Sequence, residues 1–219
     1  MKVAAKVISL VFHPLFVLTY MLWILLMVNP YMFGFSTIGE ADLLFIMVFM
    51  PTAFIPLVAV IVMKGLGLVS SLQLPNKQER IGPYIVAGVM YLALYMQFVK
   101  ANNAPQALMV CTLGATIALF TAFFINNFRK ISMHAVAMGG IVSMTILTKR
   151  FYSPDVFHMT LPVAGTLQLN TIIMLYAVIL VAGVVCTARV FLDRHDLPEI
   201  YGGFIVGFFT QLIAYLVLV

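Results

Sequence analysis

Charged residues are scarce in this chain of 219 residues: only 9% are Asp, Glu, Lys or Arg, whereas 63% are apolar or aromatic. A soluble domain typically has about a quarter charged and about half apolar residues. A soluble chain of this length could not remove so much apolar surface from water. The composition therefore excludes a cytosolic enzyme and a disordered linker, and it indicates an integral membrane protein.

Cysteine and long polar stretches are also scarce. Cys111 and Cys186 both lie inside apolar runs, which is typical of buried free thiols and excludes a secreted disulfide scaffold. No polar stretch is long enough to build a globular head on a single-span anchor. The net charge is +5, but the basic residues are scattered between apolar runs. We therefore expect membrane lipids, and no nucleic acid, as partners.

Long apolar runs dominate what remains. About 20 mostly apolar residues cross a bilayer as a helix, and seven runs approach this length, at 7–28, 43–63, 83–99, 105–125, 132–147, 169–190 and 198–219. The sequence predicts a single all-α domain over residues 1–219, a polytopic membrane helical bundle. We expect about seven transmembrane helices, or six if the short fifth run does not cross fully. Residues 151–167 are expected to form a semi-polar loop.

Basic residues concentrate on one side of this arrangement. The N-terminus and the segments 64–82, 126–134 and 189–198 share a side and carry nine of the twelve Lys and Arg residues. The positive-inside rule would make this side cytoplasmic. Six of the nine could belong to an anion-binding site, however, and the others are then three against three. The orientation in the membrane stays open.

The segment around His195 carries the strongest chemical pattern. Five residues separate Arg189 from His195, and three separate His195 from Glu199. If a helix begins near His195, then His195 and Glu199 lie on one helix face. A carboxylate beside an imidazole fixes its tautomer and activates the far ring nitrogen as a base or nucleophile. The guanidinium of Arg189 suits bidentate binding of a phosphate.

Two further patterns lie on the same side of the membrane. Ser132 is placed as the N-cap of the fifth run, with His134 in its first turn. Lys77 and Arg80 precede the helix that is expected to begin at Pro83. The free N–H groups of a helix start attract anions. Basic residues and two histidines at these helix starts would together bind a tetrahedral oxyanion and act on it.

These residues resemble the type 2 phosphatidic acid phosphatase superfamily of membrane lipid phosphatases. The third motif of that family is Ser-Arg, five residues, His, three residues, Asp. Arg189, His195 and Glu199 keep this spacing, with Ala188 in place of the serine and glutamate in place of the aspartate. The similarity covers about residues 74–207.

The other two family motifs are present in reduced form. Of the second motif, Pro-Ser-Gly-His, this chain keeps Ser132 and His134. The first motif is Lys, six residues, Arg-Pro, and Lys77, Arg80 and Pro83 supply the same residue types at a contracted spacing. The three motifs occur in the family order and on one side of the membrane.

The resemblance implies hydrolysis of a phosphomonoester or pyrophosphate on a lipid headgroup, without a metal or other cofactor. His195 would attack phosphorus to form a phosphohistidine, Glu199 would orient it, and His134 would protonate the leaving oxygen. The phosphate-binding residues would be Arg189, Lys77, Arg80 and Ser132. By analogy, we expect a multi-pass protein of a bacterial cytoplasmic membrane. Phosphatidate, phosphatidylglycerol phosphate, undecaprenyl pyrophosphate and lipid A phosphates all fit, and the sequence does not set the oligomeric state.

Two other classes of function stay open. The reduced motifs suit a catalytically inactive relative that binds anionic lipid. The proline-containing spans suit a transporter of a small anion, which would need ionisable residues near the middle of the bilayer. Only His13 is a candidate for such a position; we interpret it first as a structural hydrogen-bonding residue, with a substrate contact as the alternative.

Overall fold

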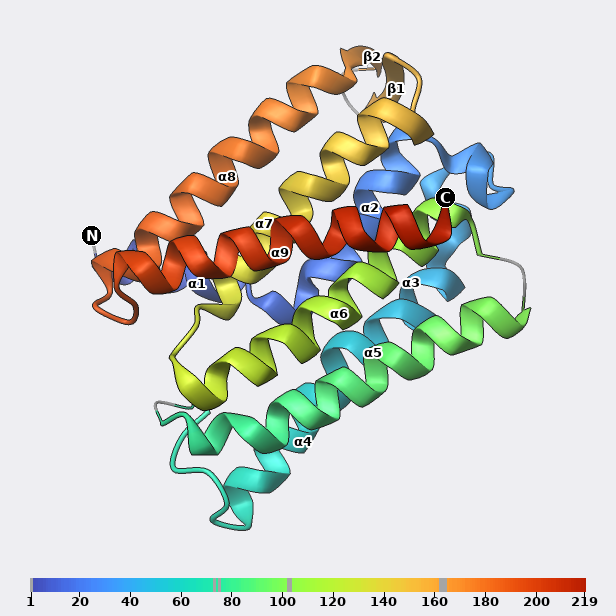
Figure 1. Ribbon diagram of the computed structural model, residues 1–219. Coiled ribbons are helices and arrows are strands. Elements are labelled where there is room, and N and C mark those ends of the chain that lie inside the picture. The colour runs from blue at the N-terminus through green and yellow to red at the C-terminus, as the bar shows by residue number, and fades with distance from the viewer. Residues whose placement is uncertain (1, 73, 75, 102–103, 162–164) are drawn as a thin grey trace.

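The computed structural model describes residues 2–72, 74, 76–101, 104–161 and 165–219. These residues form a bundle of long helices with one β-hairpin (Figure 1). The helices are α1 Lys2–Val11, α2 Val17–Val28, α3 Asp42–Phe49, α4 Ile55–Gly65, α5 Ile81–Ala101, α6 Gln106–Phe128, α7 Met133–Leu147, α8 Thr171–Phe191 and α9 Leu197–Leu218. The strands are β1 Val156–Leu161 and β2 Gly165–Asn170.

Within the described residues, six helical segments are long and apolar enough to cross a membrane, which confirms a polytopic membrane helical bundle. They are Lys2–Val28, Pro30–Gly65, Gln78–Ala101, Gln106–Phe128, Thr171–Phe191 and Leu197–Leu218. Large apolar side chains on their outer faces are exposed, for example Leu180 at 68% and Leu216 at 77%. Such a surface requires lipid around it.

The short fifth run is the centre of the bundle. Helix α7 has 15 residues, about 22 Å at 1.5 Å per residue, against about 30 Å of hydrocarbon core. All of its residues except Met133 and Ile146 are buried. A π-helical segment, Thr148–Tyr152, continues it towards the hairpin, and Figure 1 shows it passing between the other helices. Helix α7 is thus a buried core helix, which packs against α9, α8, α6 and α2.

Glycines let α7 and α9 approach closely. A Cβ added to Gly207 on α9 would overlap the Val136 carbonyl group, and one on Gly139 would overlap the Phe204 carbonyl group. Gly203 lies one turn before Gly207 and faces the Ser132 carbonyl. Small residues at this spacing are a common solution for membrane helix contacts, because they bring backbones together. The contact fixes the start of α7 beside the start of α9.

The first two predicted spans are irregular at their prolines. Pro14 separates α1 from α2 through a short 3-10 turn, Pro14–Phe16. A π-helical segment, Met50–Phe54, surrounds Pro51 and links α3 to α4. Proline has no N–H to donate and clashes with the preceding turn, so a continuous α-helical ladder is interrupted at both places.

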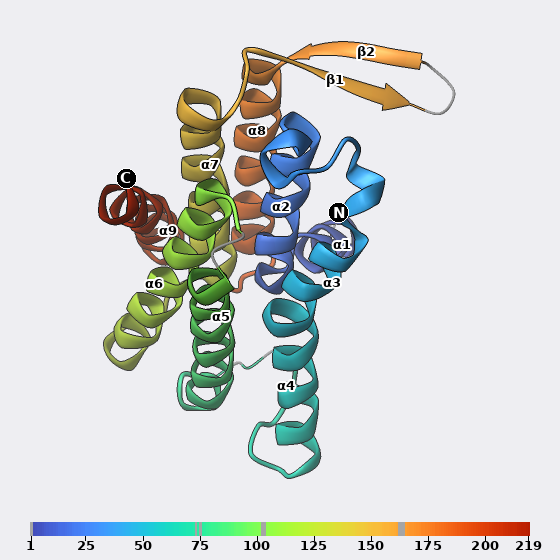
Figure 2. The same ribbon diagram turned by 90° about the vertical axis from the view of Figure 1, so that its right-hand side faces the viewer.

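The predicted loop over residues 151–167 is wrong in part, because this region contains a β-hairpin. Strands β1 and β2 pair antiparallel, with Phe157 opposite Leu169 and His158 opposite Gln168. Phe157 is buried, whereas His158 is exposed and hydrogen-bonds Gln168 at 3.2 Å. Side chains that alternate between two faces are typical of a strand. Figure 2 shows the hairpin lying across the ends of α2 and α8.

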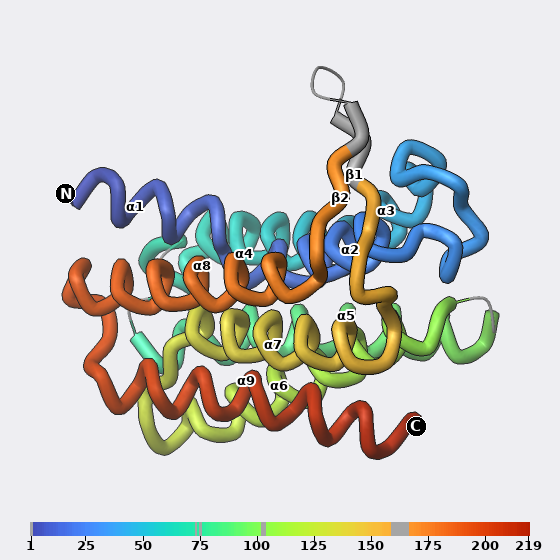
Figure 3. Tube along the Cα trace, turned by 90° about the horizontal axis from the view of Figure 1, so that it is seen from above, coloured from blue at the N-terminus to red at the C-terminus, as the bar shows by residue number. Residues whose placement is uncertain are grey.

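The connections sort to the two ends of the bundle as predicted. Figure 3 shows the N-terminus and the α8–α9 connection at one end, and the hairpin and the C-terminus towards the other. The α4–α5 and α6–α7 connections lie at the end that holds the N-terminus (Figure 1). All three motif-bearing segments therefore meet at one end of the molecule.

Candidate active site

The α8–α9 connection supplies the central pair of the site. Helix α8 ends at Phe191, Asp193 turns the chain with a left-handed φ of 52°, and α9 begins at Leu197. The helix therefore starts one residue before the predicted position near Pro198 and two residues after His195. The predicted contact is nevertheless present, because Glu199 in the first turn of α9 reaches back and its Oε2 lies 2.6 Å from Nδ1 of His195.

This contact fixes the tautomer of the His195 ring. A carboxylate can only accept, so Nδ1–H donates to Glu199 and Nε2 keeps its lone pair in the neutral ring. The side chain is only 4% exposed. Burial lowers the pKa of His195 below its usual 6.5; the hydrogen bond to Glu199 opposes this lowering, and the charges of Arg189 and Lys130 add to it. The neutral, nucleophilic form of the ring is favoured.

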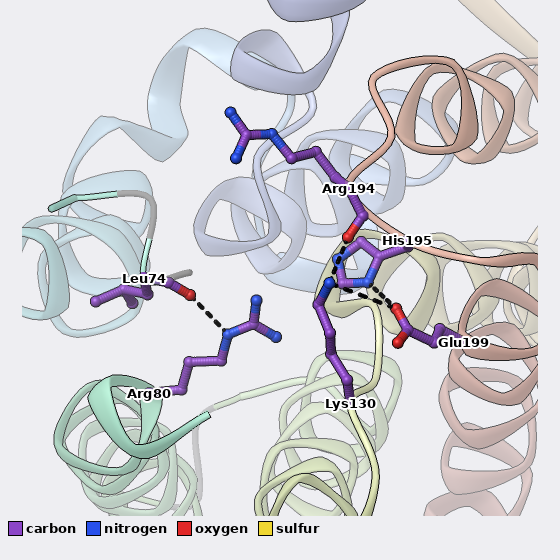
Figure 4. Close-up of polar contacts among 6 residues, drawn as sticks. All are labelled: Leu74, Arg80, Lys130, Arg194, His195 and Glu199. Atoms are coloured by element: carbon purple, nitrogen blue, oxygen red, sulfur yellow. Dashed lines mark hydrogen bonds and ion pairs between the residues drawn. The ribbon is translucent and has the colours of Figure 1, made fainter. Parts of the chain in front are cut away.

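Lys130 joins the site from the α6–α7 connection. Its Nζ lies 3.8 Å from Oε2 of Glu199 and donates to the Arg194 carbonyl at 2.7 Å. Figure 4 shows the ammonium group beside His195, whereas the Arg194 side chain points away from the pair. Lys130 is not among the phosphate-binding residues that the family resemblance implies. Its position two residues before Ser132 is the signal that could have found it.

Arg189 lies in the last turn of α8, close to all three histidines at this end. Its charge acts on the rings of His13, His134 and His195. Its Nε is buried and has no hydrogen-bond partner in the described part of the chain. A buried guanidinium donor without a partner is costly. The arrangement indicates that an anion completes the site.

Arg80 comes to the same place from the start of α5. Its Nε donates to the Leu74 carbonyl at 2.9 Å. Figure 4 shows its guanidinium group extending towards the side of the site that holds Lys130 and His195. Its charge also acts on Arg189. The structure thus gathers cations from three connections around one imidazole–carboxylate pair.

Lys77 is placed differently. Its Nζ donates to the Phe128 carbonyl at 3.4 Å, and its own carbonyl accepts from Asn126 at 3.1 Å. Phe128 is the last residue of α6, where free carbonyl groups favour a cation. The structure directs this ammonium group to the end of α6 rather than to His195 or Glu199. Of the predicted basic pair, only Arg80 joins the cluster.

His134 is held by a break in α1. Because Pro14 cannot continue the helix, α1 ends at Val11, and the Ser9 carbonyl accepts from His134 Nε2 at 2.9 Å. This bond places a proton on Nε2 of His134. To donate that proton to a leaving oxygen, His134 must exchange the Ser9 carbonyl for the substrate.

Ser132 occupies the predicted N-cap position of α7, but its hydroxyl makes no capping bond. The residue is fully buried, and its Oγ has no partner among the described residues; the same is true of the buried Oγ of Ser9. The Ser132 N–H donates weakly to the Glu199 carbonyl at 3.4 Å. Ser132 therefore links the start of α7 to α9, and its hydroxyl is a spare hydrogen-bonding group.

His13 belongs to the cluster, which the sequence analysis missed. Its ring lies edge-on to that of His134, with 5.5 Å between the ring centroids. Its Nδ1 accepts from the Leu15 N–H at 3.4 Å, which caps the short turn after the helix break. A histidine directly before a proline inside an apolar run is the sequence signal that marks it.

The described side chains do not group three or more His, Cys, Asp or Glu residues in a way that could hold a metal ion. Chemically, the cluster offers a neutral imidazole with a free nitrogen, a second imidazole as proton carrier, and three cations for an anion. Arg80, Lys130 and Arg189 supply those charges.

Comparisons with known proteins add no assignment to this geometry. No family model, no curated protein and no solved structure matches the chain. The functional conclusion therefore depends on the residues of the cluster and on their arrangement.

Proposed function

We propose that this protein is a membrane lipid phosphatase that hydrolyses a phosphomonoester or pyrophosphate of a lipid headgroup through a phosphohistidine. The observation that carries the proposal is the 2.6 Å contact between His195 and Glu199 among cations. It leaves Nε2 as the ring nitrogen with a lone pair, near the charges of Arg189 and Lys130, which would attract phosphate. The resemblance to the type 2 phosphatidic acid phosphatases points to the same chemistry.

In the first step, Nε2 of His195 attacks phosphorus and the bond from phosphorus to the lipid oxygen breaks. His134, which would carry a second proton once the negative phosphate is bound beside it, gives a proton to the leaving oxygen and becomes neutral. Glu199 stabilises the positive charge that the phosphorylated ring carries. Arg80, Lys130 and Arg189 balance the charge on the phosphoryl oxygens in the transition state.

In the second step, water attacks the phosphohistidine. His134 takes a proton from that water, the P–N bond breaks, and the electron pair returns to Nε2 of His195. Inorganic phosphate leaves and the starting protonation states are restored. The cycle needs no oxidant, reductant or metal ion from outside, only water.

The proposal is tested by measuring phosphate release from purified protein in detergent against a panel of lipid phosphates. We expect release by the wild type, inhibition by vanadate, and a loss of at least about 10³-fold in His195→Ala. Arg129→Ala serves as a matched control, because Arg129 is exposed on the same connection as Lys130. Wild-type rates in His195→Ala would refute the assignment of the nucleophile.

A binding-only relative is the second candidate, and two observations favour it. Nε2 of His134 is bonded to the Ser9 carbonyl, and Lys77 is bonded to the end of α6. Such a protein would bind lipid phosphate with no release of phosphate from any member of the panel. Binding that is lost in Arg189→Ala, together with zero turnover in the wild type, would establish this alternative.

A further inference from the structure

An apolar cavity of about 790 Å³ lies between α2, α7, α8 and the hairpin. This volume is in the range of sites that hold small molecules, about 300–1,000 Å³. Its lining includes Trp23 on α2, Met138 on α7, Ala177 on α8 and Phe157 on β1. Trp23 is 47% exposed, so the cavity has a rim on the outer, lipid-facing surface of the bundle.

One end of this cavity lies near His13 and His134. Phe12 lines the cavity and directly precedes His13. Met138 lines it and lies one helical turn after His134 on the same face of α7. The cavity therefore begins within about one helical turn of the two histidines, although the cluster residues themselves are not part of its lining.

The other end of the cavity lies at the hairpin, far from the two histidines. Ile173 lines the cavity near the start of α8, about 16 residues from Arg189, which corresponds to about 24 Å along the helix. One leaflet of a bilayer supplies only about 15 Å, half of a hydrocarbon core of about 30 Å. The hairpin residues Phe157 and Leu169 line the same end, and they face each other across the two strands.

We propose that this cavity holds one hydrocarbon tail of the lipid phosphate, that it favours tails longer than one leaflet, and that Phe157 limits the length it accepts. The identity of the headgroup rests on the proposed function. The lining is almost wholly apolar, so each additional methylene of the tail adds packing contacts with the protein until the tail reaches the hairpin. A phosphate on a short tail binds the cations without this contribution.

Trp23 makes occupancy directly measurable, since it is the single tryptophan of the chain. The probe is a lysophosphatidate brominated near the middle of its chain, added to protein in detergent, because bromine quenches tryptophan fluorescence on contact. We expect saturable quenching that the same lipid without bromine reverses. The brominated lysophosphatidylcholine serves as the headgroup control and should bind more weakly.

Two substitutions on α8 form a matched pair for this measurement. Both residues are exposed, but Ala177 lines the cavity, whereas Leu180, which is 68% exposed, lies outside its lining. We expect Ala177→Phe to raise the lipid concentration that gives half-maximal quenching at least about tenfold, because the ring fills the cavity. Leu180→Phe should leave it unchanged. Equal quenching curves for the two variants would overturn the assignment of the cavity.

Chain length is tested with octyl, dodecyl, hexadecyl and eicosyl phosphate as competitors. Micelle partitioning affects wild type and Ala177→Phe alike, so the ratio of their affinities isolates the cavity. We expect the ratio of the wild-type affinity to the Ala177→Phe affinity to rise with chain length and then level off. When both proteins also carry Phe157→Ala, the ratio should level off at a longer chain. A ratio that does not change with length would refute the proposal. Dodecyl phosphate binding and the unfolding midpoint show whether Phe157→Ala is folded.

The outcomes separate this inference from the proposed function. Quenching in His195→Ala that equals the wild type, with the expected length dependence, supports the tail site whether or not the wild type releases phosphate. Phosphate release by the wild type without quenching, and with equal rates for Ala177→Phe and Leu180→Phe, overturns the tail site and leaves the phosphatase assignment standing.

Discussion

Two histidine contacts at the same end of the bundle are built in opposite ways. His195 pairs with Glu199, four residues away, through the turn that opens α9. His134 bonds the Ser9 carbonyl across 125 residues and meets the ring of His13. The first contact depends on local spacing. The second depends on a helix break in α1 and on the depth at which α7 is buried.

The two contacts also differ in charge. His195 has a carboxylate partner that can stabilise a positive ring. The described partners of His134 are a neutral carbonyl group and a second imidazole, both near the charge of Arg189. A nucleophile needs the first environment and a proton carrier can use the second. The predictions below separate the two contacts, from the largest expected effect to the smallest.

Removing the charge of Glu199 should have the largest effect. Glu199→Gln keeps the size of the side chain but no longer stabilises a phosphorylated imidazole. We expect phosphate release to fall about 10²–10⁴-fold. Asp196→Asn is the matched control, since Asp196 is exposed on the same connection and its side chain makes no capping bond. Equal losses in the two variants would remove the special role of Glu199.

The long-range pair should follow with a smaller effect. We expect His134→Phe to lower phosphate release about 10²-fold and His13→Phe about tenfold. Because the two rings touch, the double variant should deviate from additivity by about 0.5–3 kcal/mol. His158→Phe at the hairpin should have no effect. Strict additivity of the His13 and His134 substitutions would show that their contact is not used.

The helix crossing that holds both contacts can be weakened at one glycine. Gly207→Ala places a methyl group against the Val136 carbonyl, and we expect a loss of about 1–3 kcal/mol in unfolding free energy. Gly202→Ala, on the same helix, has open space around its Cβ and should not destabilise. Unfolding in mixed detergent, followed by circular dichroism, measures both. Similar stabilities would exclude the close crossing.

The smallest effect should be the acid dependence of stability. The pKa of His195 is lowered on folding, so the unfolded chain binds more protons below the ordinary value of 6.5. The contribution of the neutral ring is therefore fully present above pH 6.5 and declines as the pH falls below it. His195→Gln should lose less stability than the wild type over that interval. Parallel unfolding midpoints for the two proteins would contradict the lowered pKa.

Much of the site could be predicted because its contacting residues lie only a few positions apart in the sequence. The interval from His195 to Glu199 corresponds to about one helical turn, and the contact forms although α9 begins two residues after His195. The destination of Lys77 could not be predicted in this way. Its partner at the end of α6 lies 51 residues away, and only the packing of α5 against α6 brings the two together.

The hairpin and the role of His13 were missed for related reasons. Each strand has six residues, and so short an alternation does not stand out beside long apolar runs. His13 lies inside an apolar run, where a local hydrogen bond explains it as well as a distant contact does. Its neighbour His134 is 121 residues away, so the choice required the fold.

The sequence by itself determined that this chain lies in a membrane as a helical bundle, since its apolar composition allows no other solvent. It also determined which connections carry the cations and histidines. The tertiary structure decided which of these groups meet: Arg80, Lys130, Arg189 and His13 join His134 and His195, and Lys77 does not. Glycine contacts between α7 and α9 and a proline break in α1 set those distances, and both act between residues far apart in the chain.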